Sequence, residues 1–232
     1  QAVAARTYAY RRIIRNDTIP EHPEAHLSTD YASGQAWVSW SDFLARFGLL
    51  EGRRLQRKIQ NAVNQTAGVI AVYEGEPILA VYHSTSGGRT ENSEHYWSEA
   101  LPYLRSVADP FGDQSPHHYS IVVFPVQDLA RRMNVENVSD IRIVERYPSG
   151  RVKTLEVGGK WFSGRTVRQN LGLKSTWFSV DLVGSEVVFS VWGYGHGVGM
   201  SQYGAHGMAE QGYGYGEILK YYYQDIELTT AY

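Results

Sequence analysis

The spacing of apolar positions changes along the chain, and each change marks an expected element. Apolar residues three and four apart predict a helix from Arg53 to Gln65, with Leu55, Ile59 and Val63 on one face. Alternation and short apolar runs predict strands, with turn residues between them. Helices are expected over 1–16, 41–44, 53–65, 126–133, 165–170, 200–211 and 215–223, and strands over 69–73, 77–82, 119–124, 141–145, 152–157, 178–182 and 187–192.

Two turn sequences join pairs of these strands. Glu74-Gly75-Glu76 and Pro148-Ser149-Gly150 each predict a β-hairpin. The order of helices, strands, a mixed stretch and helices again predicts an α+β fold, with a helical and β-hairpin core and a β-rich α+β insertion lobe. We expect residues 1–110 and 191–232 to form the core and residues 111–190 to form the lobe.

Composition narrows the classes of function. Hydrophobic residues make up 43% and charged residues 20%, as in an ordinary globular protein. The 22 Lys and Arg against 24 Asp and Glu provide no basic excess, so a nucleic-acid partner is not expected. The lack of cysteine excludes disulfides and thiolate metal sites. No apolar run reaches the length of a membrane span, so we expect no membrane contact by this segment.

The first residues already look like the interior of a helix. Gln1 to Tyr10 carry no capping residue and no initiating Met. We therefore expect further sequence before Gln1, and any targeting signal or anchor to lie in it.

Four segments carry a family resemblance. They are QAVAARTYA from Gln1, the stretch from Ala62 to Val107 that includes HSTSGGRTENSEHYW and PYLRSV, SGRTVRQNLGLKSTWF from Ser163, and GYGHGVGMSQYGA from Gly193. In this order, and over nearly the whole chain, they resemble the SpoIID/LytB family of stage II sporulation protein D and amidase enhancers.

The resemblance implies a peptidoglycan lytic transglycosylase, acting in sporulation or cell-wall remodelling. Such an enzyme uses one carboxylic acid and leaves 1,6-anhydro-N-acetylmuramic acid ends. The family's acid is a glutamate in a Glu-Met-Pro segment, which the resemblance places upstream of Gln1, so the chain alone is expected to be inert. It also implies an extracytoplasmic location, peptidoglycan glycan strands as partner and no cofactor. The alternative is a non-catalytic peptidoglycan-binding activator of a cell-wall amidase.

The resemblance and the residue types together select candidate catalytic residues. Arg6 stands in a stretch of small residues and calls for an anionic partner, either in the active site or in a structural salt bridge. Tyr103 and Arg105 alternate as on a strand, which puts both on one face, where they line a groove or form ordinary surface. The family usually has Lys where Arg105 stands. Glu91 and Glu94 are internal alternatives for the acid, but we interpret both as solvated loop carboxylates.

Further residues are candidates for substrate binding. They are His83, Ser86, Asn92, His196, Ser201 and Gln202. His83 and Ser86 lie beside two adjacent glycines and are expected to shape a cleft wall rather than to form a nucleophile pair. His196 to Gln202 lie in a glycine-rich loop that leads into a helix. The glycines either permit tight packing against the first helix or expose N–H groups to an anion or a sugar.

No metal site is expected. Some family members hold zinc with one His and two Cys in the loop after the first helix, and Ser28 and Gly34 stand at the two Cys positions here. His22 remains, with His26 and Asp30 as a weak alternative set. A third interpretation, a metal-dependent hydrolase, rests on four histidines without metal-ligand spacing. These are His83, His117, His118 and His196.

Overall fold

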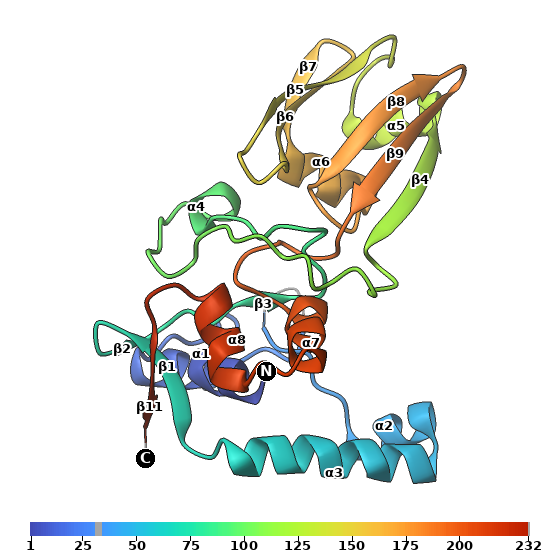
Figure 1. Ribbon diagram of the computed structural model, residues 1–232. Coiled ribbons are helices and arrows are strands. Elements are labelled where there is room, and N and C mark those ends of the chain that lie inside the picture. The colour runs from blue at the N-terminus through green and yellow to red at the C-terminus, as the bar shows by residue number, and fades with distance from the viewer. Residues whose placement is uncertain (31–33, 232) are drawn as a thin grey trace. The chain divides into compact units, whose positions relative to one another are not determined.

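The computed structural model describes residues 1–30 and 34–231, and the α+β class is confirmed (Figure 1). The chain forms two compact units, one of residues 1–80 and 225–232 and the other of residues 81–224. The predicted core of 1–110 plus 191–232 and lobe of 111–190 use other boundaries and stay a prediction.

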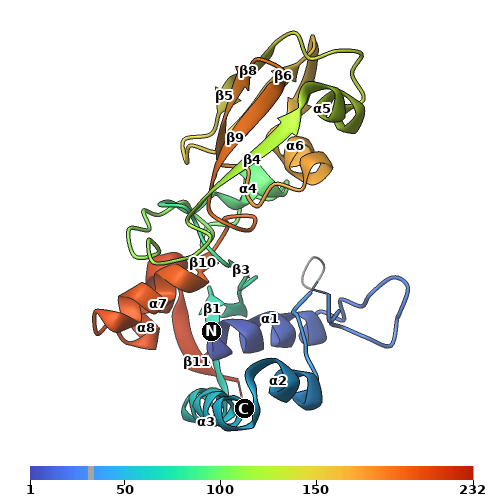
Figure 2. The same cartoon turned by 90° about the vertical axis from the view of Figure 1, so that its right-hand side faces the viewer.

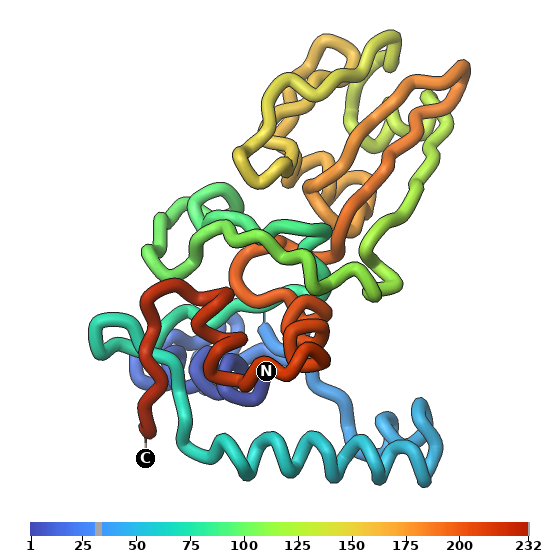
Figure 3. Tube along the Cα trace, viewed as in Figure 1, coloured from blue at the N-terminus to red at the C-terminus, as the bar shows by residue number. Residues whose placement is uncertain are grey.

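The first unit is built on α1 and a small sheet. Its helices are α1 (Ala2–Ile14), α2 (Trp40–Phe47) and α3 (Leu49–Gln65), and its strands are β1 (Val69–Tyr73), β2 (Glu76–Pro77) and β11 (Glu227–Thr230). Strand β1 pairs antiparallel with both β2 and β11, and Figure 3 shows the end of the chain running along β1. Thr7 joins helix to sheet, because its buried hydroxyl accepts a hydrogen bond from the Ala71 N–H at 2.9 Å.

Local signals explain most boundaries in this unit. The hairpin after β1 turns through Glu74 and Gly75, both at positive φ, as the sequence predicts. Helix α2 begins one residue earlier than expected, because Ser39 rather than Ser41 caps it by accepting the Asp42 N–H. The expected strand over 77–82 is wrong beyond Pro77, and only the short β3 (Tyr82–His83) follows it.

The second unit contains two three-stranded antiparallel sheets. One has the order β4-β9-β8 and the other β5-β6-β7. Their strands are β4 (Tyr119–Pro125), β5 (Ile141–Arg146), β6 (Val152–Val157), β7 (Lys160–Ser163), β8 (Phe178–Val183) and β9 (Glu186–Trp192). Helices α5 (Val126–Met133) and α6 (Gly164–Leu171) lie to one side of β4 and β9 in Figure 2. Phe124, Leu155, Val167, Phe178 and Phe189 belong to one buried cluster in this part.

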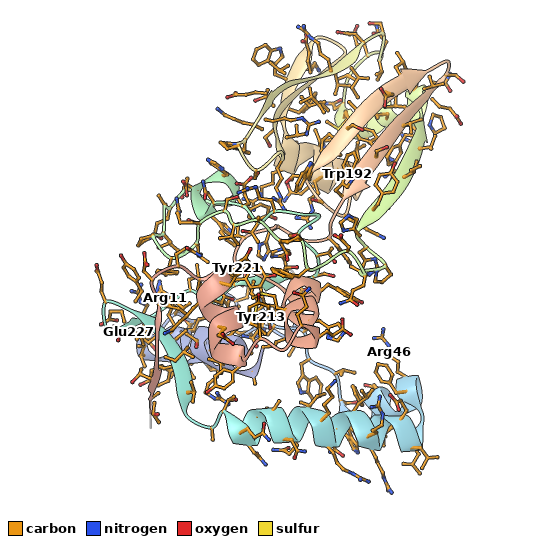
Figure 4. The ribbon with its side chains drawn as sticks, in the orientation of Figure 1. Arg11, Arg46, Trp192, Tyr213, Tyr221 and Glu227 are labelled. Atoms are coloured by element: carbon orange, nitrogen blue, oxygen red, sulfur yellow. The ribbon has the colours of Figure 1, made fainter. Side chains whose placement is uncertain are left out.

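The remaining elements of this unit are short and are connected by long loops. They are β3, α4 (Ser93–Tyr96), β10 (Met200–Ser201), α7 (Gln202–Glu210) and α8 (Tyr215–Tyr222). Strands β3 and β10 pair in parallel, which brings His83 beside Ser201. The helix expected from Met200 therefore begins two residues later. Figure 4 labels Tyr213 and Tyr221, whose rings both pack against Phe111.

Candidate functional site

A buried carboxylate lies at the centre of the second unit. The Glu91 side chain is 2% exposed, and its Oε1 accepts the Asn92 N–H and contacts His95 Nδ1, both at 2.8 Å. Its Oε2 accepts the Ser149 hydroxyl at 2.5 Å. The interpretation of Glu91 as a solvated loop carboxylate is therefore wrong. The reason is that the Glu91 N–H donates to the Gly197 carbonyl, which holds the segment beneath the glycine loop.

Arg151 supplies a positive charge in the same region. It is 2% exposed and donates to the carbonyls of Arg89 and Ser86 at 2.9 and 2.8 Å. Its guanidinium also lies over the Trp177 ring. Burial lowers the pKa of Arg151 to about 10, while the charge of Glu91 opposes that shift. We call Glu91, His95, Ser149 and Arg151 the buried polar centre.

The glycine loop packs tightly over this centre. Gly197 has φ +84°, and a Cβ there would lie 2.4 Å from Arg151 Nη2. Gly195 has φ +119°, and its Cβ would lie 2.7 Å from that of His83. Any side chain at these two positions would displace its neighbours. Of the two explanations left open for the glycines, close packing is seen, but the groups packed against Gly195 and Gly197 are His83 and Arg151 and not the first helix.

Two histidines, His196 in the loop and His83 next to it, are held in the neutral form. His196 Nδ1 accepts the Val198 N–H, so its Nε2 carries the proton and donates to the Tyr82 carbonyl, each at 3.1 Å. Burial, followed by the charge of Arg168, lowers the pKa of His196 to about 3. Burial first, and then His196, also holds the pKa of His83 well below its ordinary value. These rings lie 5.6 Å apart.

The other two histidines of the hydrolase interpretation have separate neighbours. His117 Nδ1 lies 3.3 Å from Lys174 Nζ, and His118 Nδ1 lies 3.5 Å from Asp113. Among the described residues, no three His, Cys, Asp or Glu side chains form a group suited to a metal ion.

Ser86 takes part in a second buried network. Its hydroxyl donates to Asp109 Oδ2 at 2.6 Å and accepts the Gly88 N–H at 3.1 Å. Tyr222 donates to Asp109 Oδ1 at 2.7 Å, and burial raises the pKa of Tyr222. Ser86 is 1% exposed, so its hydroxyl contributes to the buried hydrogen-bond network. It donates to Asp109 and not to His83.

Arg105 and Glu94 form a half-exposed ion pair next to the buried polar centre. Arg105 Nη1 and Nη2 donate to the two carboxylate oxygens of Glu94 at 2.8 and 2.6 Å. Nη2 also donates to Ser93, and Nε donates to the Leu101 carbonyl. The hydrogen bonds from Arg105 lower the pKa of Glu94, which is therefore ionised at neutral pH. The interpretation of Glu94 as a simply solvated carboxylate is also wrong.

Tyr103 and Arg105 do not share a strand. The segment turns at Pro102 and Tyr103, where the Leu104 N–H donates to the Leu101 carbonyl, so the expected strand face is wrong. Tyr103 is 6% exposed, and its carbonyl accepts the Gln224 N–H. Nearby, Asn92 Oδ1 accepts the Ser106 N–H at 2.7 Å and fixes the loop.

The last two candidates lie at the start of α7. Ser201 is buried and caps the helix by accepting the Gly204 N–H at 3.1 Å. Gln202 is half-buried and is the first residue of the helix. The substrate contacts predicted for these residues, and for His83, Ser86, Asn92 and His196, stay predictions.

Arg6 belongs to the first unit and binds carbonyl oxygens there. Its Nη1 donates to Thr66 and Val69 at 2.6 and 2.9 Å, and its Nη2 lies 3.4 Å from the Val63 carbonyl. The Val63 and Thr66 oxygens lie at the carboxyl end of α3, which carries partial negative charge, and the Val69 oxygen belongs to the first residue of β1. The expected anionic partner is therefore a helix end rather than a carboxylate.

A pocket of about 160 Å³ opens beside the buried polar centre. Glu91 and His95 lie on its wall together with Tyr147, Lys153 and Arg165. The rings of His95 and Tyr147 stack at 4.0 Å and 12°. The pocket therefore offers an imidazole oriented by a buried carboxylate, with two cations beside it.

Comparison with known proteins agrees with the resemblance. The family model described as "SpoIID: Stage II sporulation protein" matches residues 1–73. Stage II sporulation protein D of Bacillus amyloliquefaciens is 38% identical over 234 residues, which span 100% of this chain and 67% of that protein. This chain belongs to the SpoIID family. The corresponding protein of Bacillus subtilis (strain 168) is 37% identical and 68% covered. The amidase enhancer of that strain is 28% identical over 287 residues, with 99% of this chain and 37% of the enhancer covered.

Membership of the SpoIID family connects the chain with sporulation. Three motif stretches meet in the second unit, where the segment 83–97, the segment from 163 and the glycine loop all contribute to the structure around Glu91, whereas the segment from Gln1 lies in the first unit. Reasoning from the sequence missed Arg151 and His95. The alternating glycines of 195–199 indicated a close approach, but nothing in the chain indicated that Arg151 is the group approached.

Proposed function

We propose that the chain is part of a peptidoglycan lytic transglycosylase that acts outside the cytoplasm on glycan strands. One carboxylic acid protonates the leaving oxygen of the glycosidic bond and then accepts a proton from the 6-hydroxyl of the sugar. That hydroxyl closes the ring, and a 1,6-anhydro end forms. A hydrolase would instead require two carboxylates and a water molecule. The observation that carries the proposal is the similarity to stage II sporulation protein D over the whole chain.

The two internal candidates for the acid, Glu91 and Glu94, are both poorly suited to that role. A general acid must keep its proton near neutral pH, which requires a raised pKa. The pKa of Glu94 is lowered by Arg105, and both oxygens of Glu91 already accept hydrogen bonds. We therefore assign the acid to the glutamate that the resemblance places before Gln1.

In this proposal Arg105 binds oxygens of the sugar. Four hydrogen bonds hold its guanidinium, which has five N–H donors, and its side chain is 32% exposed. Glu94 fixes the plane of the guanidinium through the two-point contact. Tyr103, two residues earlier, anchors this segment in the interior. Arg6 has an anchoring role in the first unit, where its hydrogen bonds to the Thr66 and Val69 carbonyls fix the start of β1.

The test uses the longer protein with the upstream glutamate, and purified glycan strands that lack stem peptides. Mass spectrometry should detect anhydro ends, and replacing the glutamate with glutamine should abolish them. Arg105→Gln should lower the rate about 10²-fold, a typical cost for a lost contact to developing charge. Arg142→Gln removes an exposed arginine of the β5-β6-β7 sheet and should leave the rate unchanged. Reducing ends in place of anhydro ends would exclude the transglycosylase reaction.

The second candidate function is a non-catalytic activator of a cell-wall amidase. It is favoured by the relative named amidase enhancer. The glutamine variant of the upstream acid separates the two functions. If that variant releases no anhydro sugar but still accelerates an amidase, the chain works as a peptidoglycan-binding activator.

A further inference from the structure

The helical hairpin of the first unit exposes an unusual amount of apolar side chain. We call residues 36–65, which contain α2 and α3, the hairpin surface. Within this fully described segment, Gly52 is the one buried residue. Leu50 is 87% and Trp37 is 70% exposed. The other exposed large apolar residues are Val38, Trp40, Phe47, Leu49, Ile59 and Val63.

The hairpin has too few internal contacts to bury these side chains. Its two helices meet where Gly52 packs on Leu44, to which a Cβ at Gly52 would come within 2.7 Å. Along α2 the Trp40 ring stacks on Phe43 at 5.5 Å, and the Phe43 and Phe47 rings contact each other, tilted, at 4.7 Å. Figure 1 shows α2 and the first half of α3 extending past α1 and β1 of the same unit. Exposed apolar groups gathered in this way mark a binding surface.

The same segment is basic. Residues 36–65 hold five basic side chains against two acidic ones, Asp42 and Glu51, a formal charge of +3. The basic residues are Arg46, Arg53, Arg54, Arg57 and Lys58. The whole chain carries −2, so the other residues together carry −5. Figure 4 labels Arg46 at α2. Exposed Trp and Leu beside Arg and Lys are typical of helices that lie in the headgroup region of a membrane.

We propose that the hairpin surface docks on an anionic lipid surface. Trp37 and Trp40 favour the interface, Leu49 and Leu50 enter the edge of the acyl region, and the arginines bind the headgroups. A second copy fits less well, because a symmetric contact through this surface would bring two positive segments together. The docking is peripheral, since no helix in the described ranges is long and apolar enough to cross a bilayer. It goes beyond the proposed function and replaces the expectation that the segment avoids membranes.

The experiment is co-sedimentation of the purified chain with vesicles. Vesicles of phosphatidylglycerol and phosphatidylcholine should bind the chain, and vesicles of phosphatidylcholine alone should not. Raising the salt concentration should weaken the binding, because surface potentials fall off within a Debye length. Arg53→Glu with Arg57→Glu should raise the apparent dissociation constant at least about tenfold.

A second pair of variants tests the apolar contribution. Trp37→Ser with Leu50→Ser should also weaken binding about tenfold, as loss of buried apolar area requires. The matched control is Trp161→Ser, which removes a tryptophan that is 65% exposed in the other unit and should leave binding unchanged. All variants should keep the parent's melting temperature, because the replaced side chains are exposed.

Several results would overturn the proposal. Equal binding to both vesicle types is one, and no binding to either is another. If the apolar variants bind anionic vesicles as tightly as the parent chain, the binding is simple electrostatic adsorption. A dimer in sedimentation velocity that the same apolar substitutions dissociate would assign the surface to a second copy.

Discussion

The buried polar centre and the hairpin surface reverse the usual distribution of side chains. At the centre, Glu91 and Arg151 are each 2% exposed. On the hairpin surface, Leu50 is 87% exposed. A charged side chain can be buried where its polar atoms are hydrogen-bonded. Apolar side chains can gather on the surface where they bind another surface. The centre is therefore held by contacts within the chain, whereas the rest of the chain leaves the apolar side chains of the hairpin surface exposed.

The largest effect is expected from removing the buried cation. Arg151→Met takes away the positive charge near Glu91 and leaves the Arg89 and Ser86 carbonyls without their donor. It should lower the free energy of unfolding by about 3–5 kcal/mol, measured in urea. Arg142→Met, which breaks an exposed pair with Glu156, should cost less than about 1 kcal/mol. Equal costs for the two would contradict the assigned role of Arg151.

A methyl group at Gly197 tests how closely the loop covers the centre. Gly197→Ala should cost about 2–4 kcal/mol, because a positive φ and a clash with Arg151 act together. Gly159→Ala also meets a positive φ, +74°, but nothing lies within 4 Å of its added Cβ. Gly159→Ala should cost only about 1–2 kcal/mol, and thermal melts of both variants measure the difference. A smaller loss at Gly197 than at Gly159 would show that the loop yields easily.

Acid should weaken the second unit through its neutral histidines. The pKa of His196 is about 3 in the folded chain against an ordinary 6.5, so the unfolded chain binds more protons between these values. Stability should be full above pH 6.5 and fall by about 1–2 kcal/mol on acidification to pH 5. His196→Asn should flatten this slope in urea titrations. An NMR titration in which the His196 ring gains its proton near pH 6.5 would refute the assignment.

Breaking the half-exposed Arg105–Glu94 ion pair should change the free energy of unfolding less, and the change should depend on pH. Arg105→Gln should cost about 1 kcal/mol at pH 7. The pKa of Glu94 is lowered from 4.5, so the loss is fully present above that value, shrinks below it and disappears as the pH falls through the lowered pKa. Denaturation of both proteins at pH 7 and pH 3 measures the difference. A difference that persists at pH 3 would assign the cost to packing rather than to charge.

The smallest effect belongs to the hairpin surface. Leu50→Ser should change the free energy of unfolding by less than about 0.5 kcal/mol, because the side chain is already in solvent. Leu155→Ala in the core of the second unit should cost about 2–5 kcal/mol in the same assay. A large loss at Leu50 would mean that the hairpin is packed in solution.

Much of the local structure follows from short-range signals. The helix over 126–133 has the predicted bounds, and Ser163 and Gly172 cap α6 as their positions indicate. Both predicted hairpins, at Gly75 and Gly150, are present. Strands β7, β10 and β11 were missed because each has four residues or fewer. Strands β7 and β11 show no alternation, and β10 forms its two residues only by pairing with β3.

The site was harder to predict than the fold. The loop from His83 was recognised as important, but Glu91 was assigned to solvent because a carboxylate in a polar loop is usually exposed. Its burial depends on Ser149 and Arg151, which lie about 60 positions later in the chain. Single-sequence patterns contain spacing within an element and not contacts between distant ones. The interpretation of Arg6 had the same limit, since the helix end that it binds is remote in sequence.

The pairing of β11 with β1 has a consequence for synthesis on the ribosome. The sheet of the first unit needs residues 227–230, so it stays one strand short until translation has passed everything between them and Tyr73. The intervening residues 81–224, with their own cores, emerge earlier and have time to fold first. The entropic cost of closing a loop rises by only about 0.6 kcal/mol for each doubling of its length, so the long separation of β1 and β11 affects the order of folding more than the stability.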